Sequence, residues 1–291
     1  MSRVAIVTDS AADLPSEAAA RAGITVVPLV VSFGTQSYRA GVDLPTDEFW
    51  RRMLEPGAPF PTTAAASPGD FRSTFEGIFA TGVEAIVCVT VGGKLSATVK
   101  SATIARDMLP DREIHVIDSN SASMGVGLLA QVAAELASAG VSGSEIARIV
   151  EARTADLDLY LAMDTLEYLR KGGRISGARA AIGTVLSFKP IITVRDGLVE
   201  VFERVRTRSK ARDRVVELLT RRPVERIAFL HTMTTAAELA EVDRFRDMVV
   251  ARMPGGVDAA HVSVQAVGSS VGPHLGPGCL GAVLLHHSAP A

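Results

Sequence analysis

Apolar residues occur along this chain in short runs, and most of the stretches between these runs carry apolar residues at helical spacing. The short runs predict strands over residues 4–8, 25–33, 85–91, 114–117, 157–163, 190–194, 198–205, 226–231, 261–266 and 280–286. The intervening stretches predict helices over residues 15–22, 47–54, 68–80, 97–108, 121–139, 143–155, 176–186, 209–221 and 236–253. Such alternation predicts an α/β fold with layered, mostly parallel sheets and helices on their faces.

Residues that start helices mark several of these segments. Ser67 precedes Pro68 and Asp70, the order of a side-chain cap, a first-turn proline and an acidic residue at the positive end of a helix. Ser142 and Glu145 have the spacing of a capping box. We place a domain boundary near residue 160, to within about ten residues. It separates an N-terminal domain over 1–160 from a C-terminal domain over 161–291.

The composition narrows the class of protein. With 291 residues, of which 47% are hydrophobic, the chain can bury a large core. The formal net charge is −2, so the chain lacks the excess of Lys and Arg that is typical of proteins that bind nucleic acid. Cys88 and Cys279 lie in apolar runs and are predicted to be buried thiols. We see neither a signal peptide nor an apolar run of transmembrane length, so a soluble, cytoplasmic protein is expected.

Small polar residues follow several predicted strands, which is where ligands bind in parallel α/β sheets. Four segments have this character: 8–15, 62–67, 91–98 and 118–121. Each one alone is explained by a helix cap, but together they favour a hydroxyl-rich rim. The segment from Gly93 to Ser96 is not a phosphate-binding loop, because Leu95 separates Lys94 from the serine and the upstream glycine is missing.

A segment rich in glycine and proline, residues 272–281, surrounds His274 just before the last predicted strand. Glycine lets main chain approach a ligand and proline stiffens the path, so this loop could hold a small anion; a tight turn that contains a histidine is the alternative. The basic turn 170–174 is either an anion site at a helix start or an ordinary helix end. The sequence does not decide which of these two roles Arg174 has. The histidines lack the spacing of metal ligands, so no metal is expected.

The same segments, in this order, resemble the DegV family of bacterial fatty-acid-binding proteins. The resemblance covers nearly the whole chain and is carried by Ile6-Val7-Thr8-Asp9-Ser10, Asp13-Leu14-Pro15, Lys94-Leu95-Ser96 with Thr98 and Ser101-Ala102, Asp118-Ser119, Leu166-Glu167-Tyr168-Leu169, Lys171-Gly172-Gly173-Arg174-Ile175, Lys189-Pro190 and Gly272-Pro273-His274-Leu275-Gly276-Pro277-Gly278.

The resemblance implies a two-domain α/β protein that buries a palmitate-like long-chain fatty acid and needs no other cofactor. It implies the lipid-carrying subunit of a bacterial fatty acid kinase, in which a separate ATP-binding protein phosphorylates the bound acid for phospholipid synthesis. Such a chain performs no catalysis alone, and it is compatible with transient membrane contact. By position, Thr63, Ser96 and His274 would bind the carboxylate, with Thr98 and Arg174 as candidates for the surrounding network.

The chain departs from the family pattern at the hydroxyl segments. Ala64, Ala65 and Ala66 follow Thr63 where the family has Ser-Gln-Pro, and Gly92-Gly93 replace a Ser-Ser pair. Secondary contacts to the head group should therefore differ in this chain. Two other functions stay open at this point: an enzyme for an acyl or phosphorylated substrate with His274 as acid or base, and a module that binds a sugar or nucleotide. The sequence specifies neither the acyl-chain length nor the oligomeric state.

Overall fold

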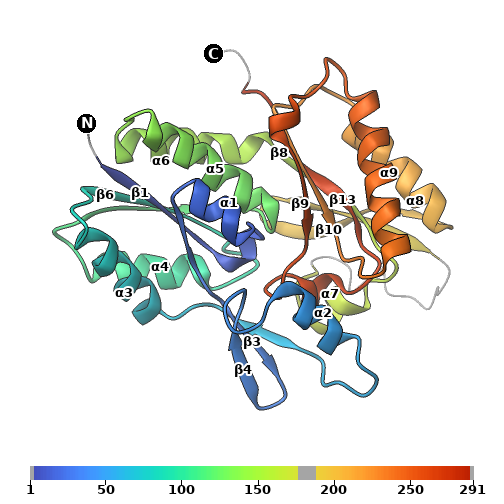
Figure 1. The fold of residues 1–291 in the computed structure, drawn as a ribbon, viewed down its shortest axis with the longest axis horizontal. Coiled ribbons are helices and arrows are strands. Elements are labelled where there is room, and N and C mark those ends of the chain that lie inside the picture. Colours follow the sequence, from blue (N-terminus) through green and yellow to red (C-terminus); the bar gives the residue numbers. More distant parts are fainter. Residues whose placement is uncertain (1–2, 176–187, 289–291) are drawn as a thin grey trace. The chain divides into compact units, whose positions relative to one another are not determined.

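A computed structural model describes residues 3–175 and 188–288 of the chain, so the helix predicted over 176–186 lies outside the described residues. The chain forms two compact units. Unit 1 comprises Met1–Ala155 together with Gly268–Ser270, and unit 2 comprises Asp156–Val267 and Val271–Ala291. Figure 1 traces the chain through both units, which are described separately below.

Unit 1 is built on a four-stranded sheet in the order β2-β1-β6-β7, and all three strand pairings are parallel. The strands are β1 (Val4–Asp9), β2 (Ile24–Val27), β6 (Ala85–Thr90) and β7 (Glu113–Asp118). The helices of this unit are α1 (Ser16–Arg21), α2 (Thr46–Met53), α3 (Pro68–Phe79), α4 (Thr98–Asp107), α5 (Met124–Ser138) and α6 (Gly143–Arg153). Helices α3 and α4 cover one face of the sheet, and α5 and α6 cover the other (Figure 1).

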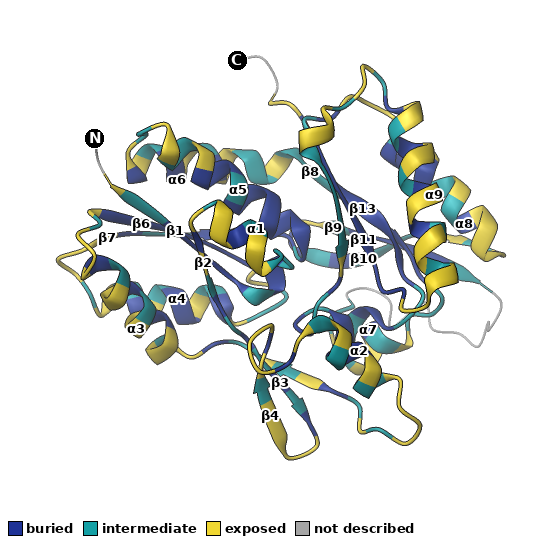
Figure 2. Ribbon diagram, in the orientation of Figure 1, coloured by how far each residue is buried: buried dark blue, intermediate teal, exposed yellow. Residues whose placement is uncertain are grey.

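Burial on both faces explains the sequence of the central strand. Every residue of β6 is buried, as Figure 2 shows in dark blue. On one face, Ile86 and Cys88 pack with Phe71 and Phe75 of α3 in a single apolar cluster. A strand covered on both faces reads as a continuous apolar run, which is how the sequence predicted it. Cys88 and Cys279 are both buried free thiols, as expected.

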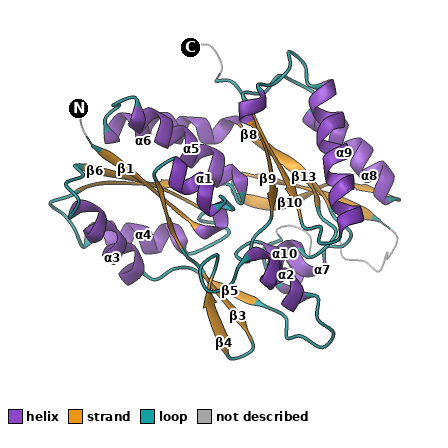
Figure 3. Ribbon diagram, in the orientation of Figure 1, coloured by secondary structure: helices purple, strands orange, loops and turns teal. Residues whose placement is uncertain are grey.

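A small antiparallel sheet in the order β4-β3-β5 completes unit 1. Its strands are β3 (Val30–Phe33), β4 (Gln36–Arg39) and β5 (Thr62–Ala64). The single strand predicted over 25–33 is therefore wrong, because β2 and β3 belong to different sheets. Figure 3 labels the three strands of the small sheet. Pro28 lies between them, and a proline has no N–H with which to continue a ladder.

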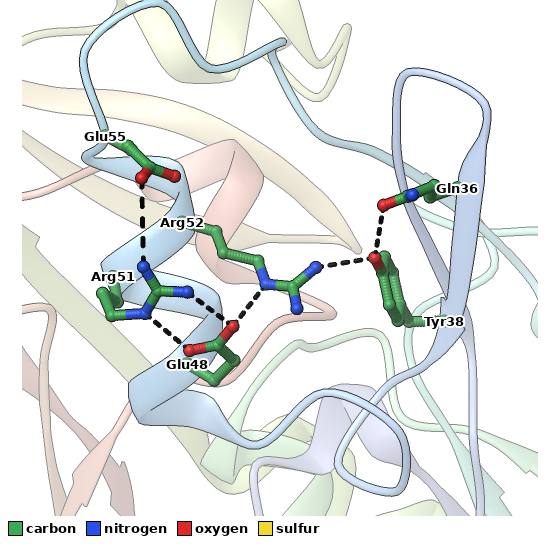
Figure 4. Close-up of polar contacts among 6 residues, drawn as sticks. All are labelled: Gln36, Tyr38, Glu48, Arg51, Arg52 and Glu55. Carbon is green, nitrogen blue, oxygen red and sulfur yellow. Dashed lines mark hydrogen bonds and ion pairs between the residues drawn. The ribbon is translucent and has the colours of Figure 1, made fainter.

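Polar side chains join α2 to the hairpin of β3 and β4, as Figure 4 shows. The Glu48 carboxylate accepts from Arg51 at 2.7 Å and from Arg52 at 2.5 Å. Arg52 also donates to the Tyr38 hydroxyl at 2.6 Å and lies over its ring, 4.9 Å from the centroid. The hydrogen bond from Arg51, followed by that from Arg52, lowers the pKa of Glu48 to about 2. These contacts fasten the small sheet within unit 1.

Unit 2 is built on a six-stranded sheet in the order β10-β9-β8-β13-β11-β12. The strands are β8 (Leu157–Ala162), β9 (Lys189–Arg195), β10 (Leu198–Val205), β11 (Arg226–His231), β12 (Val262–Ala266) and β13 (Leu280–Leu285). Its helices are α7 (Glu167–Lys171), α8 (Arg208–Leu219), α9 (Ala236–Arg252) and α10 (Gly272–Leu275). Leu219 of α8 and Phe245 of α9 share an apolar cluster with Phe229 of β11, and the two rings cross at 90°.

The α/β fold class is confirmed, but the strand directions differ from the prediction of mostly parallel sheets. Among the described residues of unit 2, only β11 and β12 pair in parallel, and the other four pairings are antiparallel. One cause is local: Asp196 and Gly197 both have positive φ, at 48° and 73°. Positive φ at both positions gives the two-residue turn that matches strand twist, so β9 returns directly as β10 without a crossover helix.

Helix caps follow the sequence closely in one case and partly in another. Ser67 is the predicted side-chain cap at the start of α3, and Asp70 completes a reciprocal capping box with it. Ser142 accepts from the Glu145 N–H at the start of α6, but the Glu145 carboxylate pairs with Arg148. Among residues 3–175 and 188–288, no helix is both long and apolar enough to cross a membrane.

Candidate fatty-acid carboxylate site

Three of the four predicted polar segments lie side by side at one edge of the parallel sheet in unit 1. Strand β1 ends at Asp9, β6 ends at Thr90 and β7 ends at Asp118, and β6 lies between the other two. The carboxyl ends of parallel strands share an edge, so the segments that follow them converge there. The fourth segment forms β5 of the small sheet and the start of α3.

Ser96 and Thr98 form a hydroxyl pair at the start of α4. Their side-chain oxygens lie 2.7 Å apart, and Ser96 Oγ also accepts from the Thr98 N–H at 3.3 Å. Thr98 is fully buried and Ser96 is half-buried. One hydroxyl hydrogen lies between the two oxygens, so the pair can still donate one. The helix start adds a positive electrostatic end, which suits a carboxylate without placing a second charge beside it.

The turn that carries Ser96 is held by carboxylates on both sides of β6. The Val91 N–H donates to Asp9 at 2.8 Å, and the Gly93 N–H donates to Asp118 at 3.1 Å. A Cβ on Gly93 would lie 2.8 Å from an oxygen of Asp118, closer than real Cβ contacts. The Gly92-Gly93 pair of this chain therefore lets its backbone approach Asp118 directly.

Thr63 occupies a different element of unit 1. It is the middle residue of β5, where it pairs with Val31 of β3 and is half-buried. Its β-branched side chain fits a short strand, which is a sufficient local reason for its position. The structure thus brings Ser96 and Thr98 together and places Thr63 in the small sheet of the same unit.

His274 belongs to unit 2 and lies on α10, so the segment predicted as a glycine-proline loop contains a short helix, with Pro273 in its first turn. The later glycines accommodate the protein's own side chains. A Cβ on Gly276 would collide with the Tyr168 ring, and a Cβ on Gly278 would collide with the Asp164 carboxylate. These glycines therefore permit close packing on α7 and on the residues before it.

The His274 ring packs against Gly172, where any Cβ would overlap it. Burial, followed by the nearby positive charge of Arg174, lowers the pKa of His274 to about 4. The ring is therefore neutral near pH 7 and offers one N–H donor and one acceptor. Arg174 donates to the Gly172 carbonyl at 2.6 Å. His274 and Arg174 therefore both contact Gly172, the residue that follows α7.

Asp164 also lies in this region, next to Gly278, and the sequence did not indicate it as a candidate site residue. Its carboxylate binds Arg208 and also Lys189, at 3.0 Å. Burial alone would raise the pKa of Asp164, but the hydrogen bonds from Arg208 and Lys189 outweigh it, and the pKa is lowered. No short motif announces this cluster, since its three members are far apart in the sequence. Among the described residues, no group of three or more His, Cys, Asp or Glu side chains could hold a metal ion.

Known proteins match this chain over almost its full length. A family model described as "Uncharacterised protein, DegV family" matches residues 3–287. DegV domain-containing protein SCO2569 of Streptomyces coelicolor is 39% identical, over 98% of this chain and 99% of that protein.

Solved structures agree in fold. The structure described as fatty acid binding of a DegV family protein from Thermus thermophilus has a TM-score of 0.87 and 33% identity, over 98% of this chain and 100% of that one. DegV from Bacillus subtilis, described as a fatty acid binding protein, has a TM-score of 0.83 and 30% identity, over 98% and 99%. Sequence, motif order and fold agree, and the chain belongs to the DegV family.

Proposed function

We propose that this chain binds a long-chain fatty acid and presents its carboxylate to a separate ATP-dependent fatty acid kinase. The similarity to fatty-acid-binding structures over nearly the whole chain supports the binding step. A stearic-acid-binding protein from Eubacterium ventriosum, with a TM-score of 0.87 and 27% identity, points to the same class of ligand. The chain itself acts as a binder and not as an enzyme.

The energetics of such a ligand divide between its two ends. An acyl chain of palmitate length gains on the order of 10 kcal/mol on burial, at about 0.8 kcal/mol for each CH₂. The carboxylate loses its hydration and must be hydrogen-bonded in return. Thr63 and Ser96 of the N-terminal domain and His274 of the C-terminal domain are the proposed partners. Thr98 supports Ser96 through their shared hydrogen bond, and Arg174 acts beside His274.

The first test is the lipid content of the purified protein. Organic extraction of the unfolded chain, followed by mass spectrometry, should release fatty acid in a ratio of about one to each chain. A chain that releases none, and that takes up no palmitate on refolding, would refute the binding step. The same spectrum would report which acyl chains the protein selects.

The second test concerns the head group. Ser96→Ala should remove a hydrogen bond to a charged group, which is worth about 1.5–3 kcal/mol and weakens palmitate retention roughly 10- to 150-fold. Ser73→Ala is the matched control, because Ser73 is an exposed serine on α3. Equal retention in the two variants would mean that the carboxylate binds elsewhere.

The kinase step rests on the family resemblance, and the sequence also lacks the spacing of a phosphate-binding loop. Palmitate-loaded chain, ATP and an ATP-binding kinase subunit should together form acyl phosphate, which hydroxylamine traps as a hydroxamate. The chain with ATP alone should give none. Hydroxamate formed by the chain with ATP alone would instead make it an enzyme.

A further inference from the structure

A short turn after β1 holds two other segments of unit 1. Residues 10–12 form a 3₁₀ turn that is capped by Asp9 and ends at Asp13, whose φ of 51° is left-handed. Asp9 is fully buried at the end of the strand. Asp9, Ser10 and Asp13 each bind residues that are distant in the sequence. This turn, residues 9–13, therefore connects segments that are far apart along the chain.

Asp9 fixes the start of the turn that carries Ser96. One carboxylate oxygen accepts from the Ala11 N–H and the other from the Val91 N–H, both at 2.8 Å. Both oxygens are therefore used, each by a backbone donor. Val91 is the first residue after β6, and the Ser96 N–H closes the same turn on the Gly92 carbonyl at 3.0 Å.

Ser10 and Asp13 bind the three residues that leave unit 2 and join unit 1, Gly268–Ser270. Ser10 Oγ lies 2.8 Å from Ser270 Oγ, and Asp13 accepts from the Gly268 N–H at 2.9 Å. A Cβ on Gly268 would lie 2.9 Å from the Asp13 oxygen, so the glycine permits this approach. Ser270 is four residues before His274, and the chain between them enters α10.

We propose that turn 9–13 is a positioning element for two segments of unit 1 that lead to proposed carboxylate ligands. It anchors the Ser96 turn through Val91, and it anchors the segment that leads to His274 through Gly268 and Ser270. This inference rests on the proposed function and adds residues to it. None of the turn residues needs to touch the ligand, because each acts through backbone that it holds in place.

The two aspartates differ in a way that makes the idea testable. Asparagine has one acceptor oxygen, so Asp9→Asn cannot accept from both Ala11 and Val91 and must release one of them. At Asp13, the second oxygen accepts from the Ser123 hydroxyl at 2.5 Å. A hydroxyl can also accept, so Asp13→Asn can keep both contacts by donating to Ser123. Asparagine also tolerates the left-handed backbone there.

Burial also makes the turn sensitive to protonation. It raises the pKa of Asp13 to about 7 and that of Asp9 to about 6. The groups that act on Asp13 are Asp9, the Ser123 hydroxyl and the Gly268 N–H, and the Cys88 thiol of β6 lies in the field of Asp9. Protection factors, which are amide exchange rates corrected for the intrinsic effect of pH, should therefore change between pH 5 and 8 in the wild type, and Asp13→Asn should reduce that change.

The experiment is amide hydrogen exchange on the full chain, with [¹⁴C]palmitate release measured in parallel. Asp9→Asn should speed exchange over 92–96, and Ser270→Ala should speed it over 271–276, each about fivefold or more for one lost hydrogen bond. Ser263→Ala on β12 is the control for Ser270→Ala and should change neither segment. Palmitate release should quicken in the same two variants.

Unchanged exchange over 92–96 in Asp9→Asn, or over 271–276 in Ser270→Ala, would overturn the proposal. So would faster exchange with palmitate release at the wild-type rate, because the turn would then be structural only. A wild-type chain that takes up no palmitate would refute the proposed function. The exchange rates would still decide separately whether the turn fastens the two segments.

Discussion

Replacing Asp13 with Asn removes the negative charge of a half-buried carboxylate while keeping the contacts to Gly268 and Ser123. The pKa of Asp13 is about 7 in the folded protein, raised mainly by burial, against an ordinary value of 3.8. The folded state therefore holds this proton more tightly than the unfolded chain does. The resulting stabilisation is complete below pH 3.8 and is lost as the pH rises through 7.

The size of the effect follows from the same two values. Each pKa unit corresponds to about 1.4 kcal/mol, so an ionised Asp13 lowers the free energy of unfolding by on the order of 4 kcal/mol at pH 8. Asp13→Asn should recover most of this at pH 8 and change stability by less than about 1 kcal/mol at pH 4. Asp9 remains in both proteins, so the difference between them isolates Asp13.

Urea unfolding followed by tryptophan fluorescence provides the assay. Trp50 is the single tryptophan of the chain, and it is buried in unit 1, the unit that contains Asp13. The curves of the two proteins should converge towards pH 4 and separate steadily above pH 5. A variant that is less stable than the wild type by the same amount at every pH would refute the reasoning, because the contacts of the carboxylate would then outweigh its burial.

Two other predictions concern unit 2. Asp158 accepts from His286 at 3.0 Å, and this hydrogen bond, ahead of the opposing effect of burial, lowers the pKa of Asp158. Its contribution is present above pH 3.8 and lost as the pH falls through the lowered pKa, so Asp158→Asn should reduce the thermal midpoint at pH 7, and this reduction should shrink as the pH falls below 3.8. Gly276→Ala should destabilise by about 1–3 kcal/mol more than Gly256→Ala in urea unfolding. Both glycines have positive φ, but only at Gly276 does the new Cβ meet the Tyr168 ring; equal losses would contradict this explanation.

Much of the secondary structure was predictable because it depends on local chemistry. The predicted strand 198–205 coincides with β10, and the predicted helix 68–80 differs from α3 by one residue. Caps, first-turn prolines and apolar spacing act within a few residues, so the sequence states them directly. The Asp196-Gly197 pair between two apolar runs is typical of a two-residue hairpin turn, and it predicts the antiparallel pairing of β9 and β10.

The candidate site was predictable only where its residues lie close together in the sequence. Ser96 and Thr98 lie two residues apart, and their shared hydrogen bond follows from that spacing at a helix start. The cluster around Asp164 was not predictable, because Lys189 and Arg208 reach it from other elements. The packing of Gly276 and Gly278 against Tyr168 and Asp164 was likewise not predictable, since sequence cannot tell a glycine that admits a ligand from one that admits a neighbouring side chain.

By itself, the sequence determined the α/β class, most element bounds, the two buried thiols and membership of the DegV family, because periodicity, caps and motif order are properties of neighbouring residues. Only the tertiary structure decided that the six-stranded sheet is mainly antiparallel, that Gly268–Ser270 join unit 1, and that the carboxylates of buried Asp9 and half-buried Asp13 bind distant backbone. The burial and the hydrogen-bond partners of a carboxylate depend on which segments meet in space, and these two factors determine its pKa.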